Sequence, residues 1–217
     1  MSPRDTKQRL LDGAEAIFAE HGFAGASLRA ITRRAGANLA AVHYHYGSKA
    51  ALFGAVFARR IEPINRERLT RLDALERDAR GRPVAVEDLV RALVEPACAV
   101  VGADEQGARF LRLSGRMFSE PGDHWQPVRG LMVPLRERFV AAFAASLPGQ
   151  DAASVFWRLH FVMGAMCHAL ATGPLLTFFS EGVVDGDDLD RMVEQLVAFL
   201  TAGMGAPHVA STQEAAR

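Results

Sequence analysis

Apolar residues in this 217-residue chain recur at helical spacing, and that pattern constrains the fold more than any other feature. Near the N-terminus, Leu10, Ala14, Ile17 and Phe18 stand at positions i, i+4, i+7 and i+8, which places them on one face of a helix. Similar runs follow along the chain between glycines and prolines, and no stretch of useful length alternates apolar and polar residues as a strand does. The sequence therefore predicts an all-α fold.

The first sixty residues contain the elements of a helix-turn-helix unit. A first helix is expected to end at Gly22, and a short second helix follows with Ser27 as its N-cap. A third helix is expected over 39–46, and Ser48 would cap a fourth. Two short helices around a glycine-bearing turn, braced by a longer first helix, are the parts of this motif, which we place at about 27–46.

The rest of the chain reads as apolar helices separated by turn signals. Pro63 interrupts the pattern of the fourth helix, which is therefore expected to kink or end there. The later helices are expected at Val86–Val101, Ala108–Phe118, Pro127–Leu147, Ser154–Thr172 and Leu189–Met204.

Positive charge is concentrated at the N-terminal end of a chain whose net charge is zero. Residues 1–60 carry nine lysines and arginines against four acidic residues, a net charge of +5, so the remaining 157 residues carry −5. A basic end on a neutral chain is what a nucleic-acid contact surface needs, and the acidic remainder would discourage non-specific collapse onto DNA.

Composition and the chain start indicate an ordinary globular protein. Hydrophobic residues make up 49% and charged residues 23% of the chain. No apolar run reaches the roughly 18–20 residues that span a bilayer, and residues 1–5 show no apolar signal region. Cys98 and Cys167 lie 69 residues apart in apolar surroundings and are expected to be buried free thiols. A cytoplasmic location is the resulting expectation.

Three stretches carry a resemblance to a known family. They are 35–53 (AGANLAAVHYHYGSKAALF), 16–23 (AIFAEHGF) and 27–31 (SLRAI). Together they resemble the signature of the tetracycline-repressor (TetR) family over about residues 6–60. His43 departs from the pattern, since many relatives carry tyrosine there, and Ala51 stands where a glutamate often completes a capping box.

The resemblance implies a DNA-binding surface on the second, third and fourth helices. It assigns Tyr44 or His45, with Lys49 and Ser27, to phosphates. The positions that typically face bases in the family are filled here by Asn38, Leu39, Ala41 and His43. For His43 both a base and a phosphate contact stay open. The complete set expected at DNA is Ser27, Arg29, Asn38, Leu39, Ala41, His43, Tyr44, His45 and Lys49.

Other roles for these residues were weighed against DNA contact. Val42 and Tyr46 are expected in the core. A metal site at His43 and His45 is rejected, because residues two apart on a helix point to different faces. Arg33 and Arg34 suit either phosphate contact or solvent, whereas Arg59 and Arg60, further along the fourth helix, are expected to be structural.

The last two long helices are more apolar than one buried face requires. Helices that are apolar nearly all round are buried, either inside their own domain or against a partner. The resemblance implies that they pack with a second copy as a four-helix bundle and form a homodimer. The residues expected at the dimer interface are Phe156, Cys167, Leu170, Met192, Leu196 and Phe199.

A ligand pocket is implied by the resemblance more than by any residue pattern. Large or adaptable side chains on the middle helices would line it, with an isolated polar group orienting the ligand. The residues expected there are Phe110, Leu113, Met117, Phe118, Trp125, Met132, His160 and Met163.

No constellation of residues supports an enzyme. The acidic run over 185–190 is interrupted by a glycine, and the residue after it is arginine, so it matches neither a diphosphate-binding nor a calcium-binding motif. Aspartates at a helix start cap the helix and complement its dipole. No nucleophile elbow, zinc motif or phosphate loop is found, and no cofactor or metal is expected.

Domain organisation and function follow from these points. We expect a helix-turn-helix DNA-binding domain over 1–60, a helical ligand-binding and dimerisation domain over 61–205, and a flexible tail over 206–217. The predicted function is a repressor released from a palindromic double-stranded operator by a small, largely apolar effector. Two rival functions are a DNA-binding protein that needs no ligand and a helical interaction module that no longer binds DNA.

Overall fold

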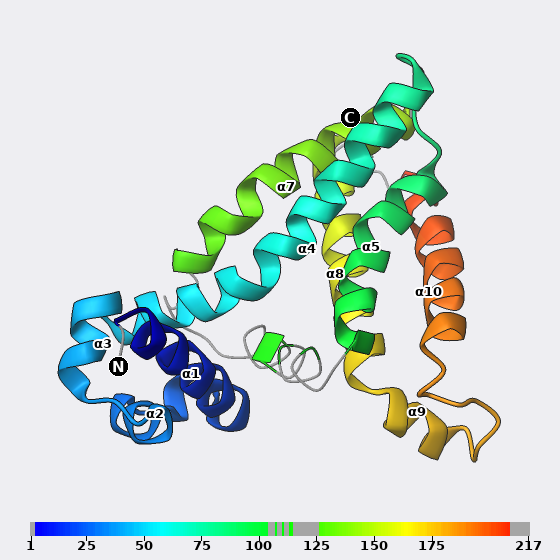
Figure 1. The fold of residues 1–217 in the computed structure, drawn as a ribbon. Coiled ribbons are helices and arrows are strands. Elements are labelled where there is room, and N and C mark those ends of the chain that lie inside the picture. The colour runs from blue at the N-terminus through cyan, green and yellow to red at the C-terminus, as the bar shows by residue number, and fades with distance from the viewer. Residues whose placement is uncertain (1–2, 104–106, 108–109, 111–112, 115–125, 209–217) are drawn as a thin grey trace, which may run out of the picture. The chain divides into compact units, whose positions relative to one another are not determined.

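The computed structural model describes residues 3–103, 107, 110, 113–114 and 126–208, and every regular element in those ranges is a helix (Figure 1). The predicted all-α fold is therefore confirmed. The helix expected over 108–118 lies mostly outside the described residues. The helices are α1 (Pro3–Gly25), α2 (Leu28–Ala35), α3 (Leu39–Tyr46), α4 (Lys49–Ala79), α5 (Val86–Ala103), α7 (Gln126–Ser146), α8 (Ala152–Ala171), α9 (Gly173–Phe179) and α10 (Leu189–Met204).

The chain divides into two units, and three helices contribute to both. Unit 1 comprises residues 1–66 and 99–134, and unit 2 comprises 67–98 and 135–217. The divisions fall inside α4, α5 and α7. The predicted domain boundary after residue 60 stays a prediction.

Several helix boundaries lie close to their predicted positions. The last helix spans 189–204 as expected, and α8 starts two residues early because Asp151 accepts the Ser154 N–H at 2.6 Å as its N-cap. Gly22 breaks the helical conformation inside α1, with φ 71° and ψ −179°. Glycine adopts such positive φ values with little strain, which is why the helix is interrupted at that residue.

Prolines bear on two of the predicted helix ends. The fourth helix was expected to kink or end at Pro63, and it does not end there, since α4 runs through that proline to Ala79. A seven-residue helix, α9, was missed after α8, because Pro174 was interpreted as a stop. Proline is equally suited to the first turn of a helix, where its missing N–H has no intrahelical acceptor, and here it begins α9.

Phenylalanine rings form the core of unit 1. Phe18 and Phe53 lie edge to face with centroids 5.0 Å apart, and Phe57 lies 5.0 Å from Phe53. Phe110 continues the cluster at 5.5 Å from Phe57. All four side chains are buried, and such pairs add to the stability that area burial supplies. This cluster anchors α1 and α4 against each other within the unit.

Polar contacts fix the C-terminal helix within unit 2. Arg91 on α5 makes a two-pronged ion pair with Glu194 on α10, at 2.9 and 2.8 Å. Arg158 on α8 donates to the carbonyl of Ala206 at 2.7 Å and to that of Met204. It thereby supplies donors to carbonyls at the end of α10 that have no intrahelical N–H partner. These contacts hold α8 and α10 in a defined pairing.

The cysteines are free, as predicted. Cys98 is buried, and burial raises the pKa of its thiol to about 11. Cys167 is only half-buried, and burial raises the pKa of that thiol as well. Both groups therefore favour the protonated form, which is a poor nucleophile.

Within the described ranges, no single helix is long and apolar enough to cross a bilayer. Only α8 and α9 taken together meet that test of length and composition, as a pair bent by 76°.

Candidate nucleic-acid interface

Three side chains start the helices of the helix-turn-helix unit. Ser27, Asn38 and Ser48 each accept a hydrogen bond from the backbone N–H three residues later, at 3.1, 2.9 and 3.1 Å. Each thereby satisfies one of the donors that a helix start leaves free. Ser27 and Ser48 do so as predicted, whereas Asn38 had been assigned only to bases.

A tight turn joins α2 to α3. Gly36 adopts a left-handed conformation, with φ 57° and ψ 40°, and its N–H bonds back to the carbonyls of Thr32 and Arg33. On the other side of α2, Gly13 of α1 lies so close that an added Cβ would meet the Ile31 carbonyl oxygen at 3.2 Å. The two glycines thus allow α2 to cross α1 closely and to turn sharply into α3.

The inner side of α3 is fixed to the rest of unit 1. Val42 is fully buried, and the Tyr46 hydroxyl donates to the Lys7 carbonyl of α1 at 2.9 Å. Burial raises the pKa of Tyr46 to about 12, so the phenol stays protonated and keeps this hydrogen bond. The predicted core role is confirmed for Val42, whereas Tyr46 is only half-buried. The contact fixes the orientation of α3 against α1.

The outer side of α3 is open to solvent. Tyr44 is 82% exposed, and Leu39 and His43, one turn apart, are exposed with it. Ala41 and His45 are half-buried, and the His45 ring lies edge-on to Tyr44 with centroids 4.9 Å apart. Polar rings beside an exposed apolar side chain can contact both base edges and phosphates.

Cationic side chains accompany this face. Lys49 opens α4 with its ammonium 4.5 Å from the centre of the Phe23 ring, a cation–π contact that orients the charge. Arg29 and Arg33 on α2 are exposed, and so is Arg34, which lies 3.8 Å from Glu20. Such exposed charges provide the electrostatic part of DNA affinity.

Two other arginines are structural, as predicted. Arg59 and Arg60 on α4 both bind the buried carboxylate of Glu15 on α1, and Arg60 Nη2 lies 2.9 Å from Glu15 Oε1. Arg59 also binds Asp12 at 2.5 Å. Their positive charge is therefore balanced inside the unit, and the charge available for DNA is carried by the remaining cations of the segment.

Neither histidine of α3 takes part in a metal site in the described part of the chain, where no cluster of three ligand-type side chains is found. His43 instead places Nδ1 3.0 Å from the carbonyl oxygen of Gly47. That contact directs the ring toward the end of its own helix.

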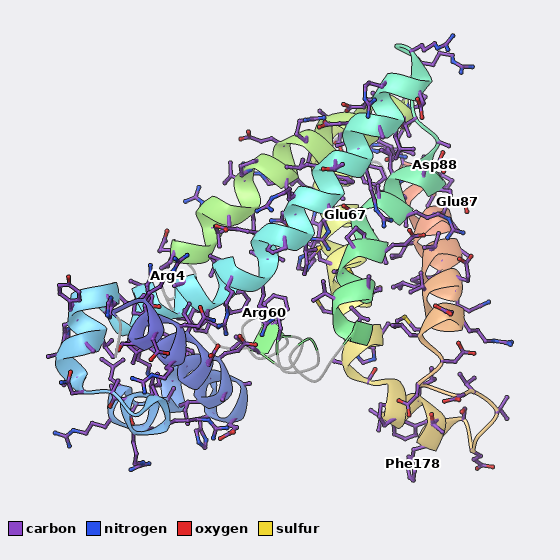
Figure 2. The ribbon with its side chains drawn as sticks, in the orientation of Figure 1. Arg4, Arg60, Glu67, Glu87, Asp88 and Phe178 are labelled. Carbon is purple, nitrogen blue, oxygen red and sulfur yellow. The ribbon has the colours of Figure 1, made fainter. Side chains whose placement is uncertain are left out.

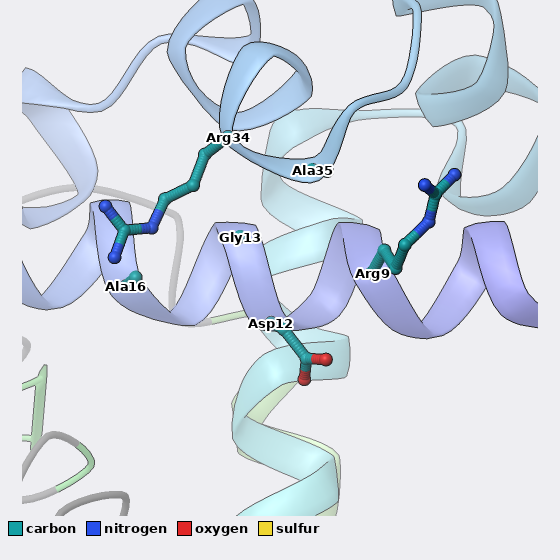
Figure 3. A pocket seen from close by; sticks show the side chains of 6 residues that line it. All are labelled: Arg9, Asp12, Gly13, Ala16, Arg34 and Ala35. Atoms are coloured by element: carbon teal, nitrogen blue, oxygen red, sulfur yellow. The ribbon is translucent and has the colours of Figure 1, made fainter.

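A shallow hollow of about 270 Å³ lies between α1 and α2, with Arg9 at one end and Arg34 at the other (Figure 3). Asp12 at its edge is already paired with Arg59. Arg9 lies against Gly36 at the C-terminus of α2, where a cation complements the helix dipole. We interpret the hollow as the seam of a helix crossing. Its other lining residues are Gly13, Ala16 and Ala35.

The residues expected in a ligand pocket fall in both units. In unit 1, Phe110 and Leu113 are buried and Met132 is half-buried, with its sulfur 3.8 Å from Asn65 Nδ2. In unit 2, His160 is exposed on α8 and Met163 is half-buried. Met117, Phe118 and Trp125 lie outside the described residues.

The residues expected at a dimer interface differ in exposure. Phe199 on α10 is 71% exposed and Phe156 on α8 is exposed as well, whereas Leu196 lies in the core of unit 2. Cys167, Leu170 and Met192 are half-buried. The exposed members are the ones that a second molecule could cover.

Further exposed rings lie on α8 and α9, outside the predicted interface set. Trp157 and Phe161, one turn apart on α8, are 63% and 60% exposed and stack with centroids 6.0 Å apart. Phe178 and Phe179 are exposed on α9, from which Phe178 projects (Figure 2). Trp157 and Phe161 stand four residues apart, which places them together on one side of the helix, and this spacing could have indicated the exposed pair.

A buried arginine in unit 2 was also overlooked. Arg68 is 1% exposed, and its Nε donates to the Leu93 carbonyl at 2.7 Å, while Nη2 lies 3.8 Å from the sulfur of Met166. Burial lowers the pKa of Arg68 to about 10. Its position four residues before the buried Leu72 placed it on an apolar helix face, which is a readable signal.

Comparison with known proteins agrees with this geometry. The family model described as bacterial regulatory proteins, tetR family, matches residues 10–56, and the tetracyclin repressor-like C-terminal domain matches 91–203, more than half of the chain. The HTH-type transcriptional repressor AcnR of Corynebacterium glutamicum is 39% identical over 54 residues. That alignment covers 25% of this chain and only 29% of the relative.

Solved structures share the fold over nearly the whole chain. HlyIIR, a hemolysin II transcriptional regulator, superimposes with a TM-score of 0.59 at 16% identity, over 90% of this chain and 99% of that one. FadR from Bacillus subtilis, solved with stearoyl-CoA, gives a TM-score of 0.55 at 11% identity, over 90% and 98%. These matches, with the two family models, lead to one conclusion: the chain belongs to the tetracycline-repressor (TetR) family of DNA-binding transcriptional regulators.

Proposed function

We propose that the protein is a repressor that binds a palindromic operator as a homodimer and is released by a small, largely apolar effector. The observation that carries the DNA-binding part is the outer side of α3, which stays exposed while its inner side is fixed to α1. A helix held in this way can enter a major groove without first rearranging. A regulator of bacterial genes would act in the cytoplasm.

Phosphate contacts would lie around α3, the helix proposed to enter the major groove. Ser27, Tyr44, His45 and Lys49 are assigned to phosphate, and the exposed Arg29 adds positive charge beside them. Ser27 uses its oxygen as a helix cap, which leaves its hydroxyl hydrogen able to bond a phosphate oxygen. Such contacts fix the position on the duplex and make affinity strongly dependent on salt.

Base contacts would come from α3 and its N-cap. Leu39 is exposed and suits the methyl group of thymine, and the small Ala41 lets the backbone approach the groove. Asn38 already accepts the Ala41 N–H through Oδ1, so its side-chain NH₂ is the group that it would present. His43 completes the set, one turn beyond Leu39.

Dimerisation would cover the exposed rings of unit 2. Trp157 and Phe161 on α8 and Phe199 on α10 expose large apolar areas on two helices that pack together. Surfaces of this kind mark interaction sites on water-soluble proteins. Gly164 lies beside them on α8 with no atom within 4 Å of an added Cβ, so a partner helix could approach closely. A two-fold dimer would present two recognition helices about 34–36 Å apart.

Effector control would act through α4. This helix begins at Lys49, shortly after α3, and extends into unit 2. A displacement of one end of α4 would therefore be transmitted to its other end within a single helix. FadR, which shares the fold, was solved with a long-chain acyl ligand, and this supports a largely apolar effector. A ligand can shift the DNA-binding equilibrium only by the difference in its affinity for the two conformers.

The test is a fluorescence-anisotropy titration of the full chain against the intergenic DNA upstream of its own gene, with a scrambled duplex as control. We expect tight binding that weakens steeply between 50 and 200 mM salt, about a thousandfold or more, and a clear preference over the scrambled duplex. Equal binding to both duplexes at every salt concentration would contradict operator recognition.

Effector control is tested with the same complex. Stearoyl-CoA and shorter acyl-CoA species are titrated into the protein–operator complex, with free coenzyme A as the control for the polar moiety. Release by the acylated species alone supports the proposal. Operator binding that no acyl compound or broader apolar ligand library weakens would favour a repressor that needs no effector.

A further inference from the structure

We infer that His43 reads a base that carries an exocyclic amino group, adenine or cytosine, by accepting a hydrogen bond at Nε2. The inference rests on the proposed function, because it assumes that α3 enters the major groove. It decides between the base contact and the phosphate contact that the sequence left open for this residue.

The tautomer of His43 follows from its contact with Gly47. Nδ1 lies 3.0 Å from the carbonyl oxygen of Gly47, within hydrogen-bond distance. A carbonyl oxygen can only accept, so Nδ1 must carry the hydrogen. A neutral imidazole has one N–H, and Nε2 is therefore left with its lone pair and acts as an acceptor.

The carbonyl that selects this tautomer is held by the turn after α3. Gly47 has a φ of 78°, and its N–H donates to the carbonyls of Val42 and His43 at 3.2 and 3.1 Å. Ser48 then caps α4. The turn is part of the fold of one chain, so the tautomer is set before DNA arrives.

Nε2 lies at the outer end of an exposed side chain. His43 follows the exposed Leu39 by four residues, and residues four apart lie on the same side of a helix. The His43 side chain is exposed and its ring makes a hydrogen bond through Nδ1, so Nε2 is the ring nitrogen that remains for a base. The groove-facing side of α3 thus presents a fixed acceptor one turn from an apolar group.

A fixed acceptor discriminates between bases on a given strand. In the major groove, adenine N6 and cytosine N4 donate, whereas guanine O6 and N7 and thymine O4 accept. Phosphate oxygens also only accept, so a phosphate contact would place two acceptors together. His43 should therefore favour amino-bearing over keto-bearing bases at one position of each half-site, by about tenfold.

His45 provides a matched control on the same helix. It is half-buried between aromatic neighbours, with ring centroids 4.9 Å from Tyr44 and 6.3 Å from Tyr46. The same substitution at His45 therefore changes an imidazole of α3 without removing the acceptor proposed to face the bases.

The experiment selects duplexes from a library with twenty random base pairs, using the full chain and the variants H43Q, H43R and H45Q. For the unaltered protein we expect one half-site position that takes adenine or cytosine on the same strand. H43R presents only donors and should move that position to guanine, whereas H43Q should narrow it to adenine. H45Q removes a proposed phosphate contact, so it should weaken binding to all sequences alike and leave the base preference at that position unchanged.

A second measurement tests the tautomer without DNA. Ring ¹⁵N spectra of the histidine-labelled full chain at pH 8.5 distinguish the two neutral tautomers, and the signal that disappears in H43Q identifies His43. We expect the hydrogen on Nδ1. A hydrogen on Nε2 would overturn the inference even if operator binding is normal.

The selection has its own contrary outcomes. If H43R and H43Q weaken binding to every sequence equally, His43 contacts phosphate and the inference is wrong. A preference of the unaltered protein for guanine or thymine at the position that H43R changes would overturn it as well. If the unaltered protein enriches no sequence, the proposed function itself fails, and this inference fails with it.

Discussion

The helix-turn-helix region and the last three helices differ in how completely each buries its own apolar surface. In the first region, the Phe18, Phe53 and Phe57 rings are buried, and polar side chains cap the helices that follow. In α8–α10, by contrast, large rings such as Trp157 and Phe199 are mostly exposed. We call the first region complete, because its rings are buried within one chain, and the second incomplete, because large rings on it stay exposed.

The difference indicates what each surface binds. The exposed rings on α3, His43 and Tyr44, carry hydrogen-bonding groups, which match a polar and charged partner such as DNA. Exposed groups on α8–α10 are largely hydrocarbon, whose contact with water is unfavourable until another apolar surface covers it. A single chain is therefore expected to fold its DNA-binding part, whereas we propose that a second copy covers its C-terminal surface.

The largest expected effect follows from breaking the closed ion-pair cluster of the first region. Glu15 is buried and binds both Arg59 and Arg60, so Glu15→Gln removes the carboxylate that the two arginines share, while Arg59 keeps its contact with Asp12. We expect a loss of about 3 kcal/mol in the free energy of unfolding. Urea denaturation followed by circular dichroism measures it.

Glu20→Gln is the matched control, since Glu20 is exposed and lies 3.8 Å from Arg34. Its cost should stay within about 0.5 kcal/mol. Equal destabilisation by the two variants would show that the region is not held by the Glu15 cluster.

The next effect concerns the incomplete surface. Trp157→Glu combined with Phe199→Glu places charge where we expect a partner molecule, and should raise the dissociation constant of the dimer about a hundredfold or more. Sedimentation velocity over a concentration series measures it, with circular dichroism to verify the helices.

Leu39→Glu is the control, because Leu39 is also an exposed apolar residue but belongs to the complete region. It should leave the dimer intact. A dimer that survives the double substitution with unchanged affinity would place the interface elsewhere.

A smaller effect tests the polar surface. Lys49→Ala should weaken DNA binding about tenfold for all sequences alike, and lower the slope of log affinity against log salt by about one per half-site. Anisotropy titrations in a salt series measure both. Arg66→Ala removes an exposed charge further along α4 and should change neither quantity. A change in sequence preference alone would remove Lys49 from the phosphate contacts.

The smallest effect separates a helix cap from a DNA contact. Ser27→Ala and Ser48→Ala each remove a cap hydrogen bond of 3.1 Å, and both should cost about 1 kcal/mol of stability. Only Ser27→Ala should also weaken DNA binding, by a few-fold, because only Ser27 is assigned to phosphate. Thermal melts and the same titrations compare them. Equal DNA affinity of the two variants would refute that assignment.

Much of the first region could be predicted from sequence, because its signals are local. Caps, glycine stops and apolar spacing are read within a few residues, so the starts of α2 and α4 and the buried Val42 follow directly. The use of Asn38 as a cap and the contact of His43 with Gly47 could not be read, since both depend on rotamers and turn geometry.

The C-terminal part was less predictable for a physical reason. Apolar spacing shows which residues seek burial but not which molecule buries them, so Leu196 and Phe199 looked alike although one is buried and the other exposed. Helix α9 was missed because proline both ends and begins helices. Which side chains would line a pocket depends on how segments distant in sequence pack together. Local sequence patterns do not contain that information.

The central claim is that a complete DNA-binding region works only when the incomplete surface is paired, and the mass of the protein–operator complex tests it most directly. Native mass spectrometry is performed on the full chain with a duplex selected from the random library, at rising protein concentration. We expect complexes with two chains, or a multiple of two, on each duplex and no stable complex with one. A tight, sequence-selective complex of a single chain with one duplex would contradict it.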